Sequence, residues 1–388
     1  MNVQQENRTT EVFDTMPQSS RKTSLSSVSL SVAISFALLA CAFLAGRGFD
    51  RPVAAKSLPP ADAPIVAATS PYIDVHTHLD PMDAPGSIRI ALQAMGSENA
   101  ARLVFMPSPF SPDDPGRFSD EVILSAEKGH RDKLDFLGGG GTLNVMIQQA
   151  VRSGEAGSEI QKKFRARAEE ILRHGASGFG EMTAEHFATG PGTYYEYAPP
   201  DHPLFLLLAD ISAEHGGVPI DFHMEAVPQE MPLPSGLKSP PNPPRLHANI
   251  AAFERLLAHN PRAKIVWAHA GWDNTGYRTP ELCRRLLRAH PNLYMEIKVD
   301  PGAVGKNSPL ANGGSGPIKP AWLRLFQDFP DRFVIGSDQH YPLPPKGPQR
   351  WQSAVLLLNQ LSPDLQRKIG MENAIRIYRL SDTARTSH

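Results

Sequence analysis

The sequence predicts an α/β fold: a (β/α)8 TIM barrel over residues 72–388, preceded by an N-terminal signal or anchor segment and a linker. Two observations predict this fold. Short apolar runs alternate with segments of helical periodicity, and eight such runs follow one another along the chain. Strands that alternate with helices form a parallel sheet with right-handed crossovers, and eight such units close the sheet into a barrel.

The first 50 residues are predicted to be a signal peptide or membrane anchor behind a polar leader. Residues 28–45 contain no charged side chain and follow Arg21 and Lys22. This apolar run is long for a signal peptide and short for a membrane span. Small residues downstream offer cleavage sites. We therefore expect an exported protein, periplasmic or membrane-anchored, that faces outside the cytoplasm. Residues 51–71 are rich in Pro and Ala and are expected to form an extended linker.

The eight apolar runs are short, and each ends in polar or small residues. They cover residues 72–76, 102–106, 134–137, 178–182, 218–223, 264–269, 292–299 and 332–338. Between them, apolar residues recur at helical spacing: Ile160, Phe164, Ala168 and Ile171, then Leu204, Leu207, Leu208 and Ile211, then Ile250, Phe253, Leu256 and Leu257. One or two closing helices are predicted over residues 359–380.

A doubly wound sheet is the alternative fold. No G-x-G-x-x-G turn follows the first predicted strand, which argues against a dinucleotide-binding sheet. The glycine run 138–141 lacks the spacing of a phosphate-binding loop. It is expected to form a flexible connection between a strand and a helix.

The composition limits the class of protein. Of 388 residues, 41% are hydrophobic and 20% are charged, which is enough apolar material for a large core. Lys and Arg number 39 against 40 Asp and Glu, so the chain lacks the basic excess of a general nucleic-acid binder. Two cysteines exclude a disulfide scaffold and a four-cysteine zinc module. Cys283 is expected to be a small core residue on a helix.

Potential metal ligands stand where the predicted strands end. In (β/α)8 barrels the functional side chains come from the C-terminal ends of the strands. Six candidates lie there: His76, His78, Glu181, His223, His269 and Asp338. The first two alternate with one residue between them and so share one face of a strand. Imidazoles and carboxylates together suit Zn²⁺, Fe²⁺ or Mn²⁺. Four other histidines precede Gly or Pro at predicted helix ends and are expected to cap helices: His174, His215, His259 and His290.

Four segments resemble the metal-dependent amidohydrolase superfamily, and in particular its amidohydrolase-related branch of TIM-barrel hydrolases and decarboxylases. They are YIDVHTHL at 72–79, PIDFH at 219–223, KIVWAHAG at 264–271 and VIGSD at 334–338. The resemblance covers about residues 72–380. It implies that His76 and His78 bind metal and that His223 joins them or holds a second ion. It also implies that Asp338 binds metal and accepts a proton from the attacking water. His269 would contact water or substrate in a one-metal site, or bind the second ion in a two-metal site.

One position departs from that family pattern. Binuclear members often bridge their metals with a carboxylated lysine on the fourth strand, where this chain has Glu181. A glutamate bridges directly in some relatives, including the TatD-like nucleases, whereas the decarboxylase relatives use one metal and no bridge. The alternative role for Glu181 is to orient a histidine. The sequence therefore favours a hydrolase of amides, lactones or esters with one or two ions, most suitably Zn²⁺. A one-metal decarboxylase and a non-catalytic exported binding barrel stay open.

A polar face along residues 292–299 suggests a contact with substrate. Tyr294, Glu296 and Lys298 alternate with apolar residues and are expected to point into the barrel. Lys298 is predicted to hold an anionic group of a small-molecule substrate, with Glu296 as its partner. The alternative is an internal Glu–Lys pair that only fills the barrel. We expect no nucleic-acid partner, membrane contact only through an uncleaved N-terminal segment, and either a monomer or a homo-oligomer.

Overall fold

The computed structural model describes residues 66–190, 192–298, 310–311, 316–342 and 349–381. The predicted signal or anchor segment, 1–50, and most of the predicted linker lie outside the described residues. Within the described part of the chain, no helix is both long and apolar enough to span a bilayer.

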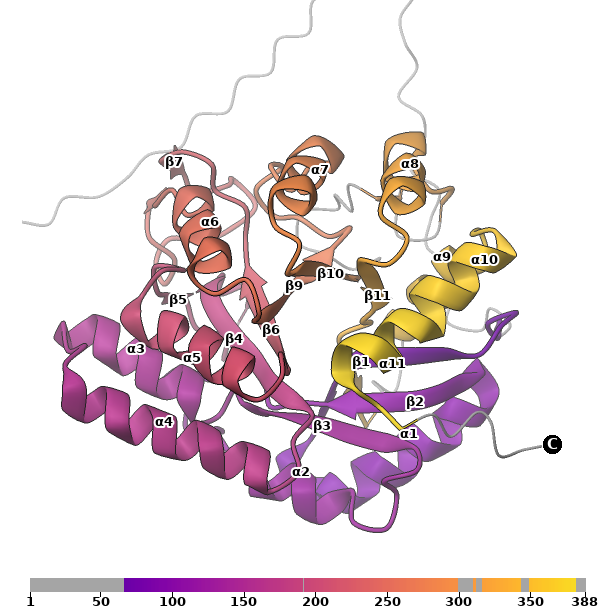
Figure 1. Cartoon of the computed structure of the whole chain (residues 1–388), viewed down its shortest axis with the longest axis horizontal. Helices are drawn as coiled ribbons and strands as arrows, with labels where there is room; N and C mark the ends of the chain where they lie inside the picture. Colours follow the sequence, from indigo (N-terminus) through magenta and orange to yellow (C-terminus); the bar gives the residue numbers. More distant parts are fainter. Residues whose placement is uncertain (1–65, 191, 299–309, 312–315, 343–348, 382–388) are drawn as a thin grey trace, which may run out of the picture. The chain divides into compact units, whose positions relative to one another are not determined.

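Eight parallel strands form the closed ring that the sequence predicts (Figure 1). They are β1 (Tyr72–Leu79), β2 (Ala100–Phe105), β3 (Leu134–Gly139), β4 (Gly178–His186), β6 (Pro219–Met224), β9 (Lys264–Ala270), β10 (Leu293–Ile297) and β11 (Phe333–Ile335). Strand β11 pairs with β1 at Ile335 and Asp74, which closes the barrel. The short strand β12 (Gln339–Tyr341) continues beside the end of β1. The (β/α)8 prediction is confirmed, and an open doubly wound sheet is excluded.

Helices connect successive strands and pack outside the ring. They are α1 (Ala84–Glu98), α2 (Glu121–Ala126), α3 (Leu143–Ser153), α4 (Ser158–Arg173), α5 (Pro203–Glu214), α6 (Ile250–His259), α7 (Pro280–Ala289) and α8 (Pro320–Asp328). Three helices close the chain after β11: α9 (Arg350–Leu358), α10 (Pro363–Arg367) and α11 (Asn373–Tyr378). The closing helices thus begin at Arg350, earlier than predicted. Short strands β5 (Glu196–Tyr197), β7 (Met231–Pro232) and β8 (Arg245–Leu246) lie in the loops.

The apolar residues divide into two main cores. The larger core lies between the strands and the helices, and it includes the predicted face of α4 through Phe164, Ala168 and Ile171. Cys283 is buried in the same core on α7, as predicted. A second core fills the part of the barrel interior that lies away from the C-terminal ends of the strands, which we call the lower half. There, strand residues such as Val266 contact the side chains of α11.

The glycines at the end of β3 are needed for close packing. A Cβ on Gly140 would lie 2.4 Å from the carbonyl oxygen of Pro107, and a Cβ on Gly141 would lie 1.8 Å from that of Phe118. Gly139 adopts a φ of 115°, which residues with a side chain rarely adopt. These glycines lie at the predicted connection between a strand and a helix, where they let backbone segments approach closely; the flexibility of the loop stays a prediction.

Candidate metal centre

The six predicted ligands converge at the C-terminal end of the barrel. Two histidines come from β1, Glu181 from β4, one histidine each from β6 and β9, and Asp338 lies between β11 and β12. All six are buried, and Asp338 is the most exposed of them at 8%. The closed barrel brings together residues that lie up to 262 positions apart in the sequence because each stands at the same end of its strand.

Four of the six donor atoms surround one point. The Nε2 atoms of His76 and His78 are 3.1 Å apart. Oε2 of Glu181 lies 3.4 Å from the first nitrogen and 3.7 Å from the second. Oδ1 of Asp338 lies 3.0 Å from His78 Nε2 and 3.9 Å from His76 Nε2. Ligands about 2.1 Å from a divalent ion lie about 3.0–3.4 Å from their neighbours in octahedral or tetrahedral geometry. The distances between the two histidines, from His76 to Glu181 and from His78 to Asp338 fall in this range, and the other two are longer. His76, His78 and Glu181 form one candidate group for an ion, and Asp338 forms another with His78 and His340.

A second group forms around the other oxygen of Glu181. Oε1 lies 2.6 Å from Nδ1 of His223 and 3.3 Å from Nε2 of His269. The two imidazole nitrogens are 3.2 Å apart. Two of these distances fit ligands of a second ion, while the 2.6 Å contact is a hydrogen bond that would open slightly to admit one. The two carboxylate oxygens of Glu181 thus face two different histidine pairs.

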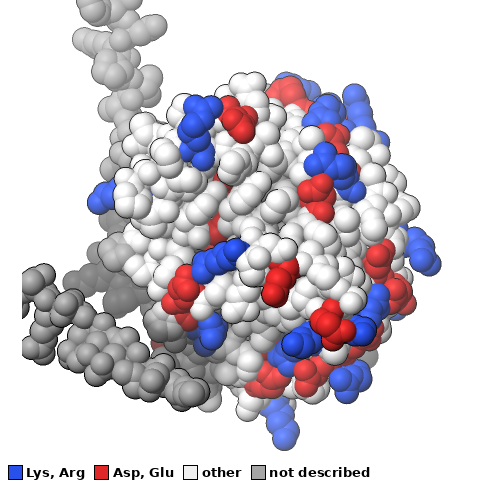
Figure 2. Space-filling view, turned by 90° about the vertical axis from the view of Figure 1, so that its left-hand side faces the viewer, with Lys and Arg blue, Asp and Glu red and all other residues white. Residues whose placement is uncertain are grey.

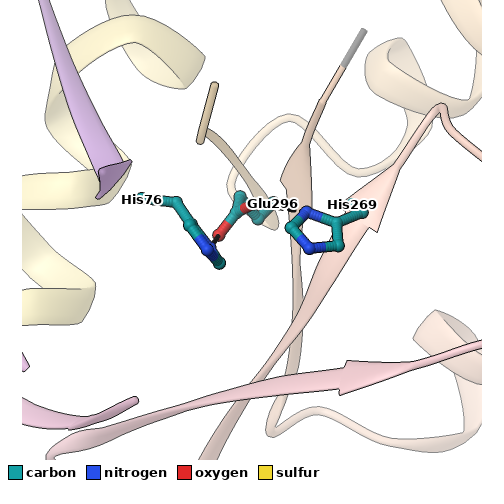
Figure 3. Close-up of side chains that lie close together, drawn as sticks. All are labelled: His76, His269 and Glu296. Carbon is teal, nitrogen blue, oxygen red and sulfur yellow. Dashed lines mark hydrogen bonds and ion pairs between the residues drawn. The ribbon is translucent and has the colours of Figure 1, made fainter. Parts of the chain in front are cut away.

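Two carboxylates lie beneath these histidines. Oε2 of Glu296 is 2.8 Å from Nδ1 of His76, and its Oε1 is 3.3 Å from Nδ1 of His269 (Figure 3). Oδ2 of Asp221 lies 3.5 Å from the same nitrogen of His76. All of these side chains are almost completely buried. A carboxylate on the far ring nitrogen fixes the imidazole orientation and leaves the other nitrogen free for a metal.

This position corrects the sequence prediction for Glu296. The residue does not partner Lys298; it lies one layer deeper, against His76 and His269. Nζ of Lys298 instead lies 2.5 Å from Oδ2 of Asp338. Side chains two positions apart on a strand point the same way but belong to successive layers, so each meets different partners across the barrel.

Buried charges shift the pKa values in opposite directions. Burial disfavours the charged forms of His76 and Glu181, but their mutual attraction and the neighbouring carboxylates and imidazoles outweigh this effect. The pKa of His76 is therefore raised well above its usual value, and that of Glu181 is held well below. Burial, together with the cation of Lys298, lowers the pKa of His269 to about 4, which keeps its imidazole neutral and able to bind a metal.

A cavity of about 480 Å³ opens above the six ligands. Phe110, Phe187 and Trp272 contribute aromatic walls. Lys298 lines the cavity as well, with its Nζ 4.4 Å from the centre of the Trp272 ring. The predicted place of Lys298 at the mouth of the barrel thus agrees with the structure, whereas its role toward substrate is a proposal.

Three residues of the cavity wall were not predicted from the sequence. His340 follows Asp338 by two positions, and its Nε2 is 3.6 Å from Oδ1 of that carboxylate. Side chains two positions apart in an extended segment point the same way, so the position of His340 relative to Asp338 is the sequence pattern that indicates it. His186 ends β4, which runs four residues further than predicted. Arg350, which donates to Oδ2 of Asp338 at 2.7 Å, starts a helix behind the barrel, and no local pattern indicates this contact.

The four histidines excluded from the site do end helices. His174, His215 and His290 are the C-terminal caps of α4, α5 and α7, and His259 is the last residue of α6. None of them lines the cavity described above.

The fold and the donor set define a (β/α)8 barrel with candidate metal sites at the ends of its strands. The chain belongs to the amidohydrolase family, whose model matches residues 165–380. The match begins after β1, so it does not include His76 and His78. A search of curated proteins gave no match.

Solved structures with a similar fold are distant in sequence. A protein of Agrobacterium tumefaciens shares 12% identity over 81% of this chain and 96% of its own, with a TM-score of 0.45. A uronate isomerase of Bacillus halodurans shares 12% identity over 76% and 69%, with a TM-score of 0.45. A 5-carboxyvanillate decarboxylase of Novosphingobium aromaticivorans, with bound manganese, shares 12% identity over 80% and 98%, with a TM-score of 0.40. Similarity at this level assigns no reaction to the chain.

Proposed function

We propose that this protein is a metal-dependent hydrolase that holds two divalent ions and cleaves an amide, lactone or ester bond of a small molecule. One observation carries the proposal: the two oxygens of Glu181 face separate histidine pairs, His76 with His78 and His223 with His269. A bridging carboxylate between two imidazole pairs is suited to a pair of ions. Zn²⁺ fits these ligands best, and Mn²⁺ or Fe²⁺ accept the same donor types.

The ligands divide between two ions. His76, His78 and Asp338 would hold the first ion, His223 and His269 the second, and Glu181 both. Bound divalent ions lower the pKa of water toward neutrality and polarise the carbonyl that is attacked.

Asp338 is placed to act as the general base. Its Oδ1 faces the histidines, and Lys298 and Arg350 contact its Oδ2. Burial opposes ionisation of this carboxyl, but the two cations outweigh that effect and hold its pKa well below the usual range. Asp338 is therefore ionised at neutral pH and accepts the proton of the attacking water. His269, neutral at the same pH, would be free to bind the second ion on the other side of Glu181.

A one-metal decarboxylase is the second candidate. The 2.6 Å contact between Oε1 of Glu181 and Nδ1 of His223 favours it, because a carboxylate hydrogen-bonded to one imidazole orients that ring without bridging two ions.

Metal analysis followed by a substrate screen tests the proposal. The purified protein is analysed by mass spectrometry for bound metal and then assayed with lactones, esters, amides, phosphoesters and aromatic carboxylic acids. Two ions per chain and hydrolysis of a member of the first three classes support the hydrolase. One ion with release of carbon dioxide favours the decarboxylase, and bound metal without any turnover indicates a non-catalytic binding barrel.

We further propose that the barrel is exported and acts on small molecules instead of nucleic acids. The uncharged run at 28–45 behind Arg21 and Lys22 supports export. Acidic and basic side chains are interspersed on the face shown in Figure 2, without a continuous basic surface. Protease treatment of intact cells tests the location, and a protected full-length chain in the cytoplasm would contradict it.

A further inference from the structure

Arg278 connects the ends of the two strands that carry the second histidine pair. Its side chain lies in the loop between β9 and α7 and is only 1% exposed. One terminal nitrogen donates to the carbonyl of Ala268 at 2.5 Å, and the other donates to the carbonyl of Met224. These carbonyls adjoin His269 and His223 in the sequence. A single guanidinium therefore joins the backbones that position both imidazoles.

The β-ladder does not provide this connection itself. The register of β6 with β9 runs from Pro219 and Lys264 to Phe222 and Trp267, and both histidines lie beyond it. His269 also has a left-handed backbone with a φ of 66°. Such a conformation is strained for a residue with a side chain and persists only where its surroundings fix it.

Further contacts fix Arg278 itself. Its guanidinium carbon lies 4.6 Å from the centre of the Trp267 ring. The indole nitrogen of Trp267 donates to the same Met224 carbonyl at 2.8 Å. In the same loop, Asn274 donates to Oε1 of Glu225 at 2.6 Å, which ties the loop to the residue that follows β6.

The chemistry of the guanidinium suits this role. Burial of a permanent charge is costly unless its donors are satisfied. Both terminal nitrogens of Arg278 donate hydrogen bonds, whereas its Nε has no hydrogen-bond partner among the described residues. The groups that the terminal nitrogens of Arg278 contact are backbone carbonyls, and a planar fork can hold two of them in a fixed relation. An ammonium group is a single point charge on a flexible stem and cannot fix the same pair.

We propose that Arg278 is a positioning residue for the second ion. By holding the ends of β6 and β9 together, it sets the 3.2 Å separation between Nδ1 of His223 and Nε2 of His269. This inference rests on the proposed two-ion function. The first ion depends on the β1 histidines, which Arg278 does not contact.

The test measures metal binding by four forms of the full chain. Wild type, Arg278→Lys, Arg278→Met and a control, Arg332→Lys, are stripped with a chelator, reloaded with Zn²⁺ and dialysed. Bound zinc is counted, and both affinities are measured by competition with a chromogenic chelator. Thermal unfolding of each metal-free form shows whether it is folded.

Arg332 is a matched control at the opposite end of the barrel. It donates to the carbonyl of Leu293 at 2.6 Å and to that of His290 at 3.4 Å, and it lies 5.3 Å from the centre of the Tyr294 ring. It thus contacts two carbonyls and one aromatic ring near the start of β10, although both carbonyls accept from the same terminal nitrogen and the side chain is less buried than that of Arg278. A loss that reflects general destabilisation would appear in both variants.

Wild type should hold two ions per chain. Both Arg278 variants should keep the first ion and bind the second about 10–100-fold more weakly, the range typical of groups that orient metal ligands. Arg332→Lys should keep both ions. Arg278→Met removes a positive charge near the second site. By electrostatics alone this loss should strengthen the binding of a cation there, so weaker zinc binding by this variant would identify altered geometry as the cause.

Two results would overturn the inference and leave the proposed function standing. One is wild-type affinity for both ions in a folded Arg278→Lys protein, and the other is an equal loss of the second ion in Arg332→Lys. A single ion in the wild type would instead overturn the two-ion function, and this inference with it.

Discussion

The two halves of the barrel interior differ in chemistry although the same strands build both. The lower half is apolar: Ile73, Val75, Val104, Leu137, Val266, Tyr294 and Val334 pack against Ile377 and Tyr378 of α11. The upper half holds the six candidate ligands, which are histidines and carboxylates, and the carboxylates beneath them. Apolar burial stabilises the fold, whereas buried charges are costly unless paired or bound to metal. The apolar lower half therefore stabilises the barrel, and this stability allows the upper half to hold the buried polar side chains of the candidate site.

The change from one half to the other takes place within β1. Val75 belongs to the lower apolar core, and the next residue, His76, belongs to the metal centre. The register between β1 and β2 shifts between Asp74 and Thr77. This irregularity lies where β1 passes from the apolar core to the candidate metal site. Substitutions before it should therefore affect stability, and substitutions after it should affect metal binding and activity.

Asp338→Asn should produce the largest effect, and on activity. The amide keeps the size and part of the ligating ability but loses basicity, so turnover should fall about 10²–10⁴-fold, as when a general base is lost. Metal content should fall less than in His76→Ala. The measurement is kcat together with bound metal per chain. A fully active Asp338→Asn protein would refute the assigned roles.

Ile377→Ala should have the opposite profile. The side chain is fully buried in the lower core, and its truncation should reduce the free energy of unfolding by about 2–5 kcal/mol. Metal content and kcat of the folded fraction should change little, because Ile377 belongs to the apolar core and not to the candidate metal groups. Denaturant titration and metal analysis of the same sample give both values. Loss of metal from the folded variant would show that the two halves are coupled.

Glu181→Gln should reduce bound metal from about two ions per chain to one. A neutral amide bridges two cations far less well than a carboxylate, and the histidine pairs on either side remain in place. Unfolding stability should change little. One ion in both wild type and variant would refute the two-ion model and favour the decarboxylase.

Lys298→Met should raise KM about 10–100-fold for an anionic substrate, the range expected from one lost charged hydrogen bond. The free energy of unfolding should change little, because Arg350 still contacts Asp338. The assay compares anionic and neutral members of the substrate class found in the screen. Equal KM values in wild type and variant would remove Lys298 from the substrate site.

Glu98→Gln should leave metal content and kcat unchanged and alter only the pH dependence of the free energy of unfolding. Burial raises the pKa of Glu98 from 4.5 to about 8, and the hydroxyl of Tyr72 donates to its Oε2 at 3.0 Å. The folded chain thus keeps a proton that the unfolded chain releases. The stability from Glu98 is complete below about pH 4.5 and is lost as pH rises through about 8, by at most about 1.4 kcal/mol per pH unit.

Glutamine does not ionise, so the variant should lose less stability than wild type between pH 5 and pH 8.5. Denaturant titrations at both values provide the comparison, and parallel losses in the two proteins would contradict it. Glu98 also sharpens the contrast with Asp338, whose pKa is lowered by two cations despite burial.

The eight strands and the six candidate ligands can be predicted from the residue pattern alone. The strands are recognisable because apolar runs bounded by polar residues recur in alternation with helical faces. The ligands are recognisable because a parallel barrel collects the ends of all its strands at one face. His76, Glu181 and Asp338 meet for this reason, and no detail of the packing is needed to expect it.

Which of these groups face one another follows from the folded structure and not from the local sequence pattern. The partner of Lys298 proved to be Asp338 and not Glu296, and Arg350 reaches the site from a helix behind the barrel. Arg278 holds two strand ends from a loop. Alternation along a strand is a local property and can be read from the residues. Contacts across the barrel depend on the stagger and tilt of the strands, which closure of the whole sheet sets, so no single segment encodes them.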